Sequence, residues 1–221
     1  MKNEKKKNKI IIAAAIFFAA AFALWTLLVS FVGKAPIGPM NSEVGFAYFN
    51  GFFHRLIGVN MTLYTLTDLL GLVPIFTALF FAGLGAWQLI RRRSLFLVDR
   101  SLLALGIFYI AVIGVYVLFE LITVNYRPVL IEGRLEGSYP SSTTMLVMSV
   151  MPTAAKELRG RIKTPVLRYI AISAVWGFLA FMVIGRIVSG VHWMSDIIGG
   201  ALISAGLVLA YCAFAEKTGT R

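Results

Sequence analysis

The sequence predicts an all-α membrane protein with six transmembrane helices and an interfacial helix in the first outer connection. Of its 221 residues, 59% are hydrophobic and only 14% are charged, whereas a soluble domain carries about a quarter charged residues. Several apolar runs also reach the roughly 20 residues that a helix needs to cross a bilayer. Little length remains for a soluble domain, so residues 1–221 are expected to form a single membrane-embedded domain.

Each expected helix corresponds to an uncharged or nearly uncharged run. Backbone polar groups in a bilayer must be satisfied within the segment itself, so these runs are expected to be helical. The fourth run is the weakest, because it is short, rich in hydroxyl groups and interrupted by Pro152. It is needed for the basic clusters to fall on one side. The expected helices are 10–33, 67–90, 101–122, 142–157, 166–186 and 192–215.

Basic clusters predict the orientation of these helices, because Lys and Arg are retained on the cytoplasmic side of membrane proteins. With six helices, all four clusters lie on one side: MKNEKKKNK, RRR with Arg100, KELRGRIK and the terminal EKTGTR. Both termini are therefore expected in the cytoplasm, with the protein in the plasma (cytoplasmic) membrane. The first run is too long for a cleaved secretory signal and is expected to be a retained anchor. Contact with anionic lipid accounts for the net charge of +11, so no nucleic-acid partner is expected.

The first outer connection, 34–68, contains a helical stripe of apolar side chains. Phe49, Phe52, Phe53 and Leu56 follow the i, i+3, i+4, i+7 spacing of one helix face. This stripe predicts a short helix that lies in the membrane interface. The single cysteine, Cys212, lies in an apolar run, excludes an internal disulfide and is expected to be buried and inert.

The stretch GRIVSGVHWMSDIIGG, residues 185–200, places ionisable groups between two apolar runs, which marks a candidate functional site. His192 and Asp196 are four residues apart and share a helix face. A carboxylate that holds one imidazole nitrogen leaves the other nitrogen free and basic. The alternative is a purely structural His–Asp pair.

Two arginines and a serine-rich segment extend this constellation on the same outer side. The guanidinium groups of Arg127 and Arg186 match phosphate oxygens, although either one alone is also explained by snorkelling to lipid headgroups. Ser141, Ser142 and Thr143 open the fourth expected helix, where free amides bind anions. The alternative there is an ordinary N-cap at Ser141 or Ser142. Together, these features predict an anion site.

Three short patterns then resemble the signatures of a known family, the type 2 phosphatidic acid phosphatase superfamily, which includes the vanadium haloperoxidases. They are Arg127-Pro128, Pro140-Ser141-Ser142-Thr143 and Arg186-x5-His192-x3-Asp196. The third is the most specific, and the six-helix arrangement is also similar to that of the membrane members.

The resemblance implies a role for each matching residue. His192 would be the nucleophile that forms a phosphohistidine, and Asp196 would orient it and stabilise its charge. The phosphoryl oxygens would be cradled by Arg127, Arg186, Ser141 and the amides of Ser142 and Thr143. These groups neutralise spread negative charge, so no metal or other cofactor is expected.

Two positions depart from the family pattern. Glu120 stands where the first signature has a lysine, and Thr143 stands where the second has a histidine that protonates the leaving group. A threonine hydroxyl cannot act as a general acid near neutral pH. Glu120 is one candidate donor; His54 is another, although an ordinary interfacial histidine explains it as well.

The third alternative is a leaving group that barely needs a proton, as in an isoprenoid diphosphate such as undecaprenyl diphosphate. Replacement of a lysine by Glu120 argues against this more highly charged substrate. The expected function is hydrolysis of a lipid phosphate or isoprenoid diphosphate at the outer face. The rival is a degenerate family member that binds or moves phosphorylated lipids, while a transporter is disfavoured because internal repeats are missing. The expected partners are the lipid substrate and the bilayer, and a homodimer is left open.

Overall fold

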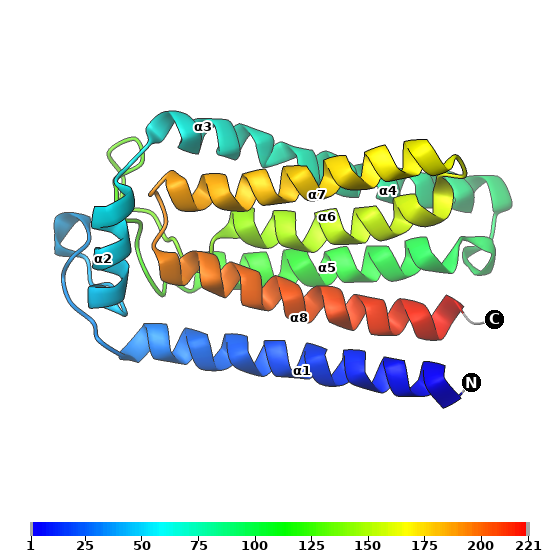
Figure 1. Ribbon diagram of the computed structural model, residues 1–221, viewed down its shortest axis with the longest axis horizontal. Coiled ribbons are helices and arrows are strands. Elements are labelled where there is room, and N and C mark those ends of the chain that lie inside the picture. The colour runs from blue at the N-terminus through cyan, green and yellow to red at the C-terminus, as the bar shows by residue number, and fades with distance from the viewer. Residues whose placement is uncertain (1, 220–221) are drawn as a thin grey trace.

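Long helices lie side by side along one axis and form an elongated bundle (Figure 1). This computed structural model describes residues 2–219, and the surroundings of side chains within 5–215. Parts of the first and last basic clusters, at 1–4 and 216–221, lie outside the described side chains. The long helices are α1 (Lys2–Phe31), α4 (Leu72–Arg92), α5 (Arg100–Leu121), α6 (Ser142–Arg161), α7 (Pro165–Val188) and α8 (Met194–Gly219), and the shorter ones are α2 (Ala47–Ile57) and α3 (Met61–Leu70).

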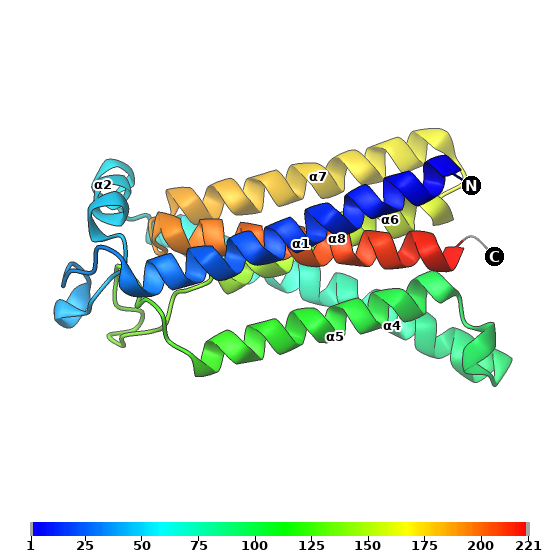
Figure 2. The same ribbon diagram turned by 90° about the horizontal axis from the view of Figure 1, so that it is seen from below.

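The two ends of the bundle differ in what they carry. The first and last described residues lie at one end, together with the α4–α5 and α6–α7 connections (Figure 1). The other end holds the connections at 32–60, 122–141 and 189–193, and α2 lies across it in both views (Figures 1 and 2). The residues of the predicted anion site therefore gather at the end opposite to the termini.

α6 departs from the expected membrane pattern. Within the described residues, five helices are long and apolar enough to cross a membrane: Lys5–Phe31, Met61–Arg92, Arg100–Leu121, Pro165–Val188 and Met194–Ala215. α6 is not among them, so the expected six apolar spans are not confirmed. The protein is an all-α, multi-pass membrane protein with five candidate spans.

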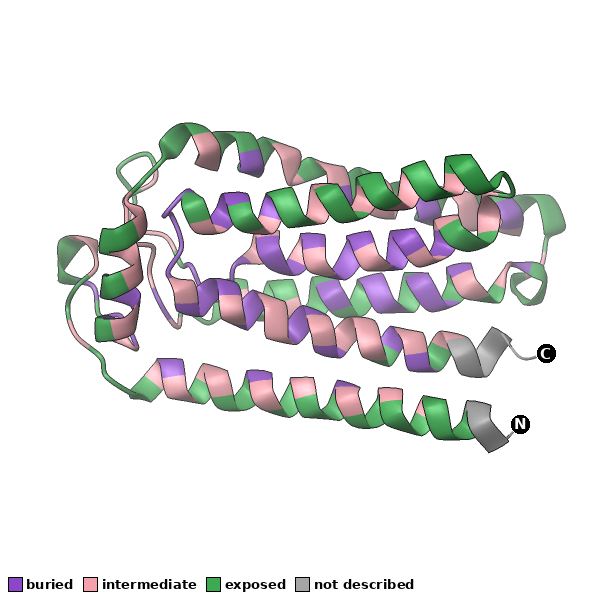
Figure 3. Cartoon of the chain, viewed as in Figure 1, coloured by how far each residue is buried: buried purple, intermediate pink, exposed green. Residues whose placement is uncertain are grey.

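The polarity of α6 has a physical explanation. α6 packs against α4, α5, α7 and α8, and Figure 3 shows that much of it is buried among them. Its hydroxyl groups bond within the protein: Ser149 Oγ lies 3.2 Å from Ser204 Oγ, and Thr153 Oγ1 lies 3.3 Å from Tyr109 Oη. A hydropathy pattern reports contact with lipid, and α6 mostly faces protein instead.

The second span begins earlier than the sequence predicts. It was expected to start at residue 67, but α3 begins at Met61 and continues through Gly71 into α4, so the candidate span is Met61–Arg92. Asn60 caps its start, because the Asn60 side chain accepts a hydrogen bond from the Leu63 amide at 2.9 Å. Residues 61–66 of the expected outer connection are thus helical, and α3 packs beside α7.

A helix is present where the apolar stripe predicts one. α2 exposes Phe52 and Leu56, and Tyr48 is 87% exposed, whereas Asn50 is fully buried toward α8. The helix therefore has one exposed apolar face and one face anchored to the bundle. Its location in the membrane interface stays a prediction.

Candidate active site

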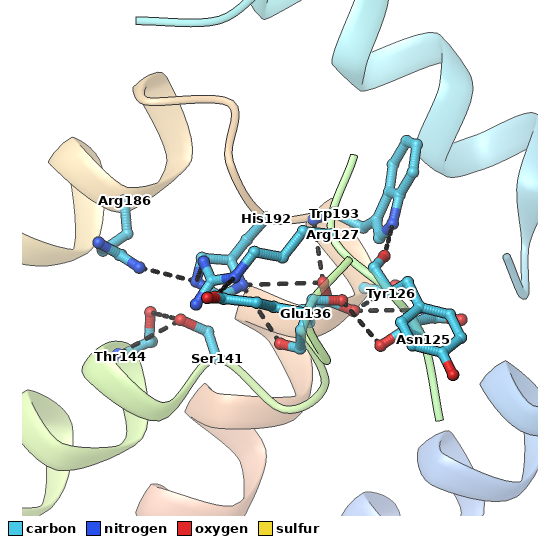
Figure 4. Close-up of polar contacts among 12 residues, drawn as sticks. Asn125, Tyr126, Arg127, Glu136, Ser141, Thr144, Arg186, His192 and Trp193 are labelled. Carbon is cyan, nitrogen blue, oxygen red and sulfur yellow. Dashed lines mark hydrogen bonds and ion pairs between the residues drawn. The ribbon is translucent and has the colours of Figure 1, made fainter. Parts of the chain in front are cut away.

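Two guanidinium groups and one imidazole meet at the end of the bundle opposite to the termini. Arg127 comes from the α5–α6 connection, Arg186 from the last turn of α7, and His192 from the α7–α8 loop (Figure 4). Arg186 Nη2 lies 2.8 Å from His192 Nε2, and Arg127 Nη1 lies 3.1 Å from the same nitrogen. Segments that are far apart in the sequence therefore converge on one ring nitrogen.

The hydrogen bonds of His192 define its tautomer. Its Nδ1 lies 3.2 Å from the carbonyl oxygen of Ser138, which can only accept a hydrogen bond, so Nδ1 carries the proton. The Nε2 lone pair then faces the two guanidinium donors. Burial, and then the charges of Arg127 and Arg186, lower the pKa of His192 well below 6.5. The ring is thus a neutral base with its free nitrogen aimed at an anion site.

This lowered pKa leads to an expected titration. The chain has two histidines, so the His54→Asn variant leaves His192 as the single imidazole for NMR titration in detergent. His192 should stay neutral at pH 7 and take up a proton only below its unfolded value of about 6.5. The unfolded state then binds this proton more readily than the folded state. The free energy of unfolding should therefore decrease as pH falls from about 6.5 toward the lower pKa of the folded state. A midpoint at or above 6.5 would contradict this geometry.

The loop that carries His192 is fixed by a close backbone approach. Gly190 has a φ of +65°, and a Cβ at this position would lie 1.8 Å from the carbonyl oxygen of Gly58. The Asn60 amide donates to the Ser189 carbonyl at 2.9 Å. The α2–α3 connection therefore clamps the loop directly before the imidazole.

Gly190→Ala is expected to displace this loop and lower both activity and thermal stability. A left-handed backbone and a steric clash together typically cost about 1–3 kcal/mol or more, which is a shift of several degrees in Tm. Gly177→Ala, on the exposed side of α7 with open space around its Cβ, is the matched control and should be neutral or stabilising. Equal behaviour of the two variants in a melting assay would show that the clamp is unimportant.

Asp196 lies close to His192 but bonds mainly to the surrounding loops. Its Oδ2 is 3.9 Å from His192 Nδ1, and it accepts a hydrogen bond from the Trp193 amide at 3.0 Å. Oδ1 accepts from Asn125 Nδ2 and from Ser195 Oγ, both at 3.3 Å. The Ser138 carbonyl is therefore the direct partner of the imidazole, while Asp196 supplies a buried negative charge beside it.

A buried amide network holds Asp196 in place and was not predicted from the sequence. Asn50 Nδ2 donates to Ser195 Oγ at 2.9 Å, and its Oδ1 accepts from the Ser195 amide at 3.0 Å. Asn125 Oδ1 accepts from the Gly45 amide at 3.0 Å. The network ties α2 and two loops to the start of α8. The sequence signal that could have indicated Asn50 is its position as an uncharged polar residue within the mostly apolar segment that forms α2.

Each arginine also has an acidic partner and an aromatic neighbour. Arg127 Nε lies 3.1 Å from Glu136 Oε2, and Arg186 Nη1 lies 3.6 Å from Asp68 Oδ1. The ring of Tyr64 lies under both guanidinium groups, 5.8 Å from the Cζ of Arg127 and 4.9 Å from that of Arg186. Cation–π attraction at such distances contributes roughly 0.5–2 kcal/mol each.

Tyr64 was missed because the sequence places it in the expected outer connection, and Thr67 and Asp68 had no predicted role at the start of the second expected helix. Tyr64 and Asp68 are four residues apart, with Thr67 between them, and all three face α7 only because α3 is helical. Arg186 Nη1 lies 3.5 Å from Thr67 Oγ1. The signal that could have found them is the spacing of polar residues within the start of the second span.

An anion hollow and a side groove adjoin these side chains. The anion hollow, of about 90 Å³, is lined by Arg127, His192, Ser138, Ser142 and Glu120 among others. The side groove, of about 490 Å³, opens between α4 and α5 and is lined mainly by apolar residues. In the described part of the chain, no three His, Cys, Asp or Glu side chains are grouped to hold a metal ion.

Similarity to known proteins agrees with this geometry. Residues 117–219 match the model of the PAP2 superfamily and include both arginines, His192 and Asp196. This segment belongs to the PAP2 superfamily. The family expected from the three signatures is thus confirmed.

A solved PAP2 protein has the same fold. The structure of a transmembrane PAP2 type phosphatidylglycerolphosphate phosphatase from Bacillus subtilis superposes with a TM-score of 0.62 at 19% sequence identity. The similarity covers 92% of this chain and 96% of that one. No curated protein matches the chain in sequence.

The serine segment of the PAP2 match lies partly outside the anion hollow. Ser141 is fully buried and caps α6, where its Oγ accepts from the Thr144 amide at 3.4 Å. The Ser141 amide donates to the Asp196 carbonyl at 3.0 Å. Ser142 lines both cavities, while Thr143 lines the side groove. The structure thus gives Ser141 the N-cap role that the sequence left open.

The two expected proton-donor candidates lie on different sides of His192. Glu120, on the last turn of α5, lines the anion hollow. His54, on α2, packs against Trp193 with ring centroids 5.3 Å apart and bonds to the backbone of Gly190. Burial lowers the pKa of His54. His54 thus supports the loop that carries His192. The cavity that both histidines line has a volume of about 10 Å³, no larger than one water molecule.

Proposed function

We propose that this protein hydrolyses a lipid phosphate through a phosphohistidine at His192. The observation that carries the proposal is the pair of guanidinium groups at 2.8 and 3.1 Å from His192 Nε2, the nitrogen that carries no proton. A phosphoryl group that enters between them meets a neutral nucleophile and two fixed positive charges. Phosphoryl transfer depends chiefly on such positioning and charge neutralisation.

The first chemical step forms the P–N bond and breaks the P–O bond to the lipid. His192 Nε2 attacks phosphorus while Arg127 and Arg186 hold the equatorial oxygens. The imidazole becomes cationic, and the Ser138 carbonyl and Asp196 stabilise that charge from the Nδ1 side, at 3.2 and 3.9 Å. Water then attacks phosphorus, the P–N bond breaks, and phosphate leaves.

The side groove is suited to the lipid tail. Leu72 and Ile75 of α4 face Val112 and Ile113 of α5 across it, and its polar end lies at Asp68, Ser142 and Thr143. It adjoins the anion hollow, so a lipid can keep its tail at the membrane side while its phosphate reaches His192. The apolar stripe on α2 does not line this groove.

The charges around the site favour a monophosphate over a diphosphate. Asp68 and Glu136 already pair with the two arginines, and Glu120 adds a third carboxylate at the hollow. A diphosphate brings more negative charge into the same surroundings and is repelled more strongly. This argues against undecaprenyl diphosphate, the substrate that the missing histidine at Thr143 would suggest when taken alone.

The active site is proposed to face the extracytoplasmic side. The RRR cluster of 91–93 and the α6–α7 connection with Lys163 lie at the end of the bundle that carries the termini. Basic residues of short loops are retained in the cytoplasm, so these clusters support a cytoplasmic location of both termini and an outer location of His192.

The test is release of inorganic phosphate by the detergent-purified protein from lipid mono- and diphosphates with matched tails. We expect turnover of the monophosphate, inhibition by vanadate, and an acid-labile phosphoprotein after rapid denaturation in base. Vanadate takes the geometry of the transition state and can bond to the histidine. Lipid binding without phosphate release from any substrate would favour the degenerate member instead.

A further inference from the structure

The position of the leaving oxygen follows from the two cavities. If phosphorus lies at His192 in the anion hollow and the tail lies in the side groove, the bond that breaks must lie where the cavities meet. Among the described residues, three line both cavities: Tyr116, Ser142 and Met145. The leaving oxygen therefore passes these three side chains, and this placement rests on the proposed function.

Among these three side chains, Tyr116 is the one suited to donate a proton. Methionine has no proton to give, and an aliphatic hydroxyl such as that of Ser142 is too weak an acid near neutral pH. The Tyr116 hydroxyl forms a hydrogen bond with the Glu120 carboxyl group, one turn further along α5. Glu120 itself lines the anion hollow with His192 and Arg127.

The other nearby carboxyl groups are already engaged as counterions. Glu136 lies 3.1 Å from Arg127, and Asp68 lies 3.6 Å from Arg186. Glu120 forms no ion pair within the part of the chain that the structure describes. Glu120 is therefore left to exchange a proton with the Tyr116 hydroxyl, its hydrogen-bond partner.

We propose that Tyr116 and Glu120 together protonate the leaving oxygen of a lipid monophosphate. As the P–O bond breaks, the Tyr116 hydroxyl proton moves to the leaving oxygen, and the Glu120 carboxyl proton replaces it on the phenol. When water attacks the phosphohistidine, its proton returns through Tyr116 to the Glu120 carboxylate. Tyr116 touches the substrate and is catalytic, whereas Glu120 supplies the proton from behind.

This pair links the two departures of the sequence. Thr143 cannot protonate a leaving group, and Glu120 stands at a position that carries a lysine in the related signature. A carboxyl group at the hollow supplies the acid that the serine segment lacks. The two substitutions therefore form a single arrangement in which the proton comes from α5 rather than from the start of α6.

The test compares two monophosphates that differ in leaving group: a long-chain alkyl phosphate, and a nitrophenyl phosphate that carries the same chain on its ring. The alkoxide needs a proton and the nitrophenolate does not. Tyr116→Phe and Glu120→Gln should lower kcat on the alkyl phosphate by roughly 10²–10⁴ with little change in KM. Both variants should hydrolyse the nitrophenyl phosphate near the wild-type rate.

The controls are Tyr48→Phe on the exposed face of α2 and Glu132→Gln in the exposed 131–134 turn, which should leave both rates unchanged. The proposal is overturned if either variant loses activity on both phosphates to the same extent, as a misfolded protein would. It is also overturned if either variant keeps full activity on the alkyl phosphate. Wild-type protein that releases phosphate from neither substrate would overturn the proposed function together with this inference.

Discussion

Replacing His192 with alanine is expected to reduce phosphate release by at least about 10⁴-fold, because the variant has no group that can form the covalent intermediate. Removal of a nucleophile from a hydrolase typically costs as much or more. The two guanidinium groups remain in the variant, so substrate binding should persist. The measurement is kcat on a lipid monophosphate, with trapping of the acid-labile phosphoprotein alongside it.

The same variant separates an enzyme from a binding protein. If lipid binding and phosphate release are identical in wild type and His192→Ala, the released phosphate does not come from this site. Asp196→Asn is the companion variant, since it removes the buried charge 3.9 Å from Nδ1 while keeping the shape of the side chain. Loss of the equivalent carboxylate in a Ser-His-Asp triad costs about 10⁴. A much smaller effect here would show that the Ser138 carbonyl suffices.

The fold follows from the sequence wherever helices face lipid. The apolar runs of α1, α5, α7 and α8 mark spans because a bilayer demands long uncharged helices. α6 escapes this rule, since its neighbours satisfy its hydroxyl groups, as Ser204 does for Ser149. The start of the second span was also misplaced, because residues 61–66, with polar side chains such as that of Tyr64, resemble a loop until the contact of Tyr64 with Arg186 is seen.

The site could be predicted only where chemically distinctive residues lie close together in the sequence. The pattern from Arg186 to Asp196 lies within one loop and two helix ends, so its residues meet whatever the rest of the chain does. Asn50 and Asn125 act through contacts with Ser195 and Asp196 that span large sequence separations, and no local pattern encodes them. The N-cap contact of Ser141 with the Thr144 amide likewise depends on the full burial of Ser141, which only the fold shows.

Arg186→Ala is expected to lower kcat/KM by about 10³–10⁵, the range typical of an arginine that stabilises a phosphoryl transition state. The side chain is 1% exposed and reaches His192 Nε2 at 2.8 Å with one nitrogen and Asp68 at 3.6 Å with another. Arg186→Lys keeps the charge but loses the planar fork and much of the stacking on Tyr64, so only partial recovery is expected.

The matched control is Arg168→Ala, at the opposite end of α7, which should leave turnover unchanged. Tyr64→Phe keeps the aromatic face under both guanidinium groups and should retain activity. Tyr64→Ala should weaken vanadate binding as well as turnover, because the two like-charged groups lose the cation–π attraction of the shared ring. An Arg186→Ala protein within tenfold of wild type would mean that Arg127 alone carries the phosphoryl charge, and that convergence of two arginines on one nitrogen is not what makes His192 a nucleophile.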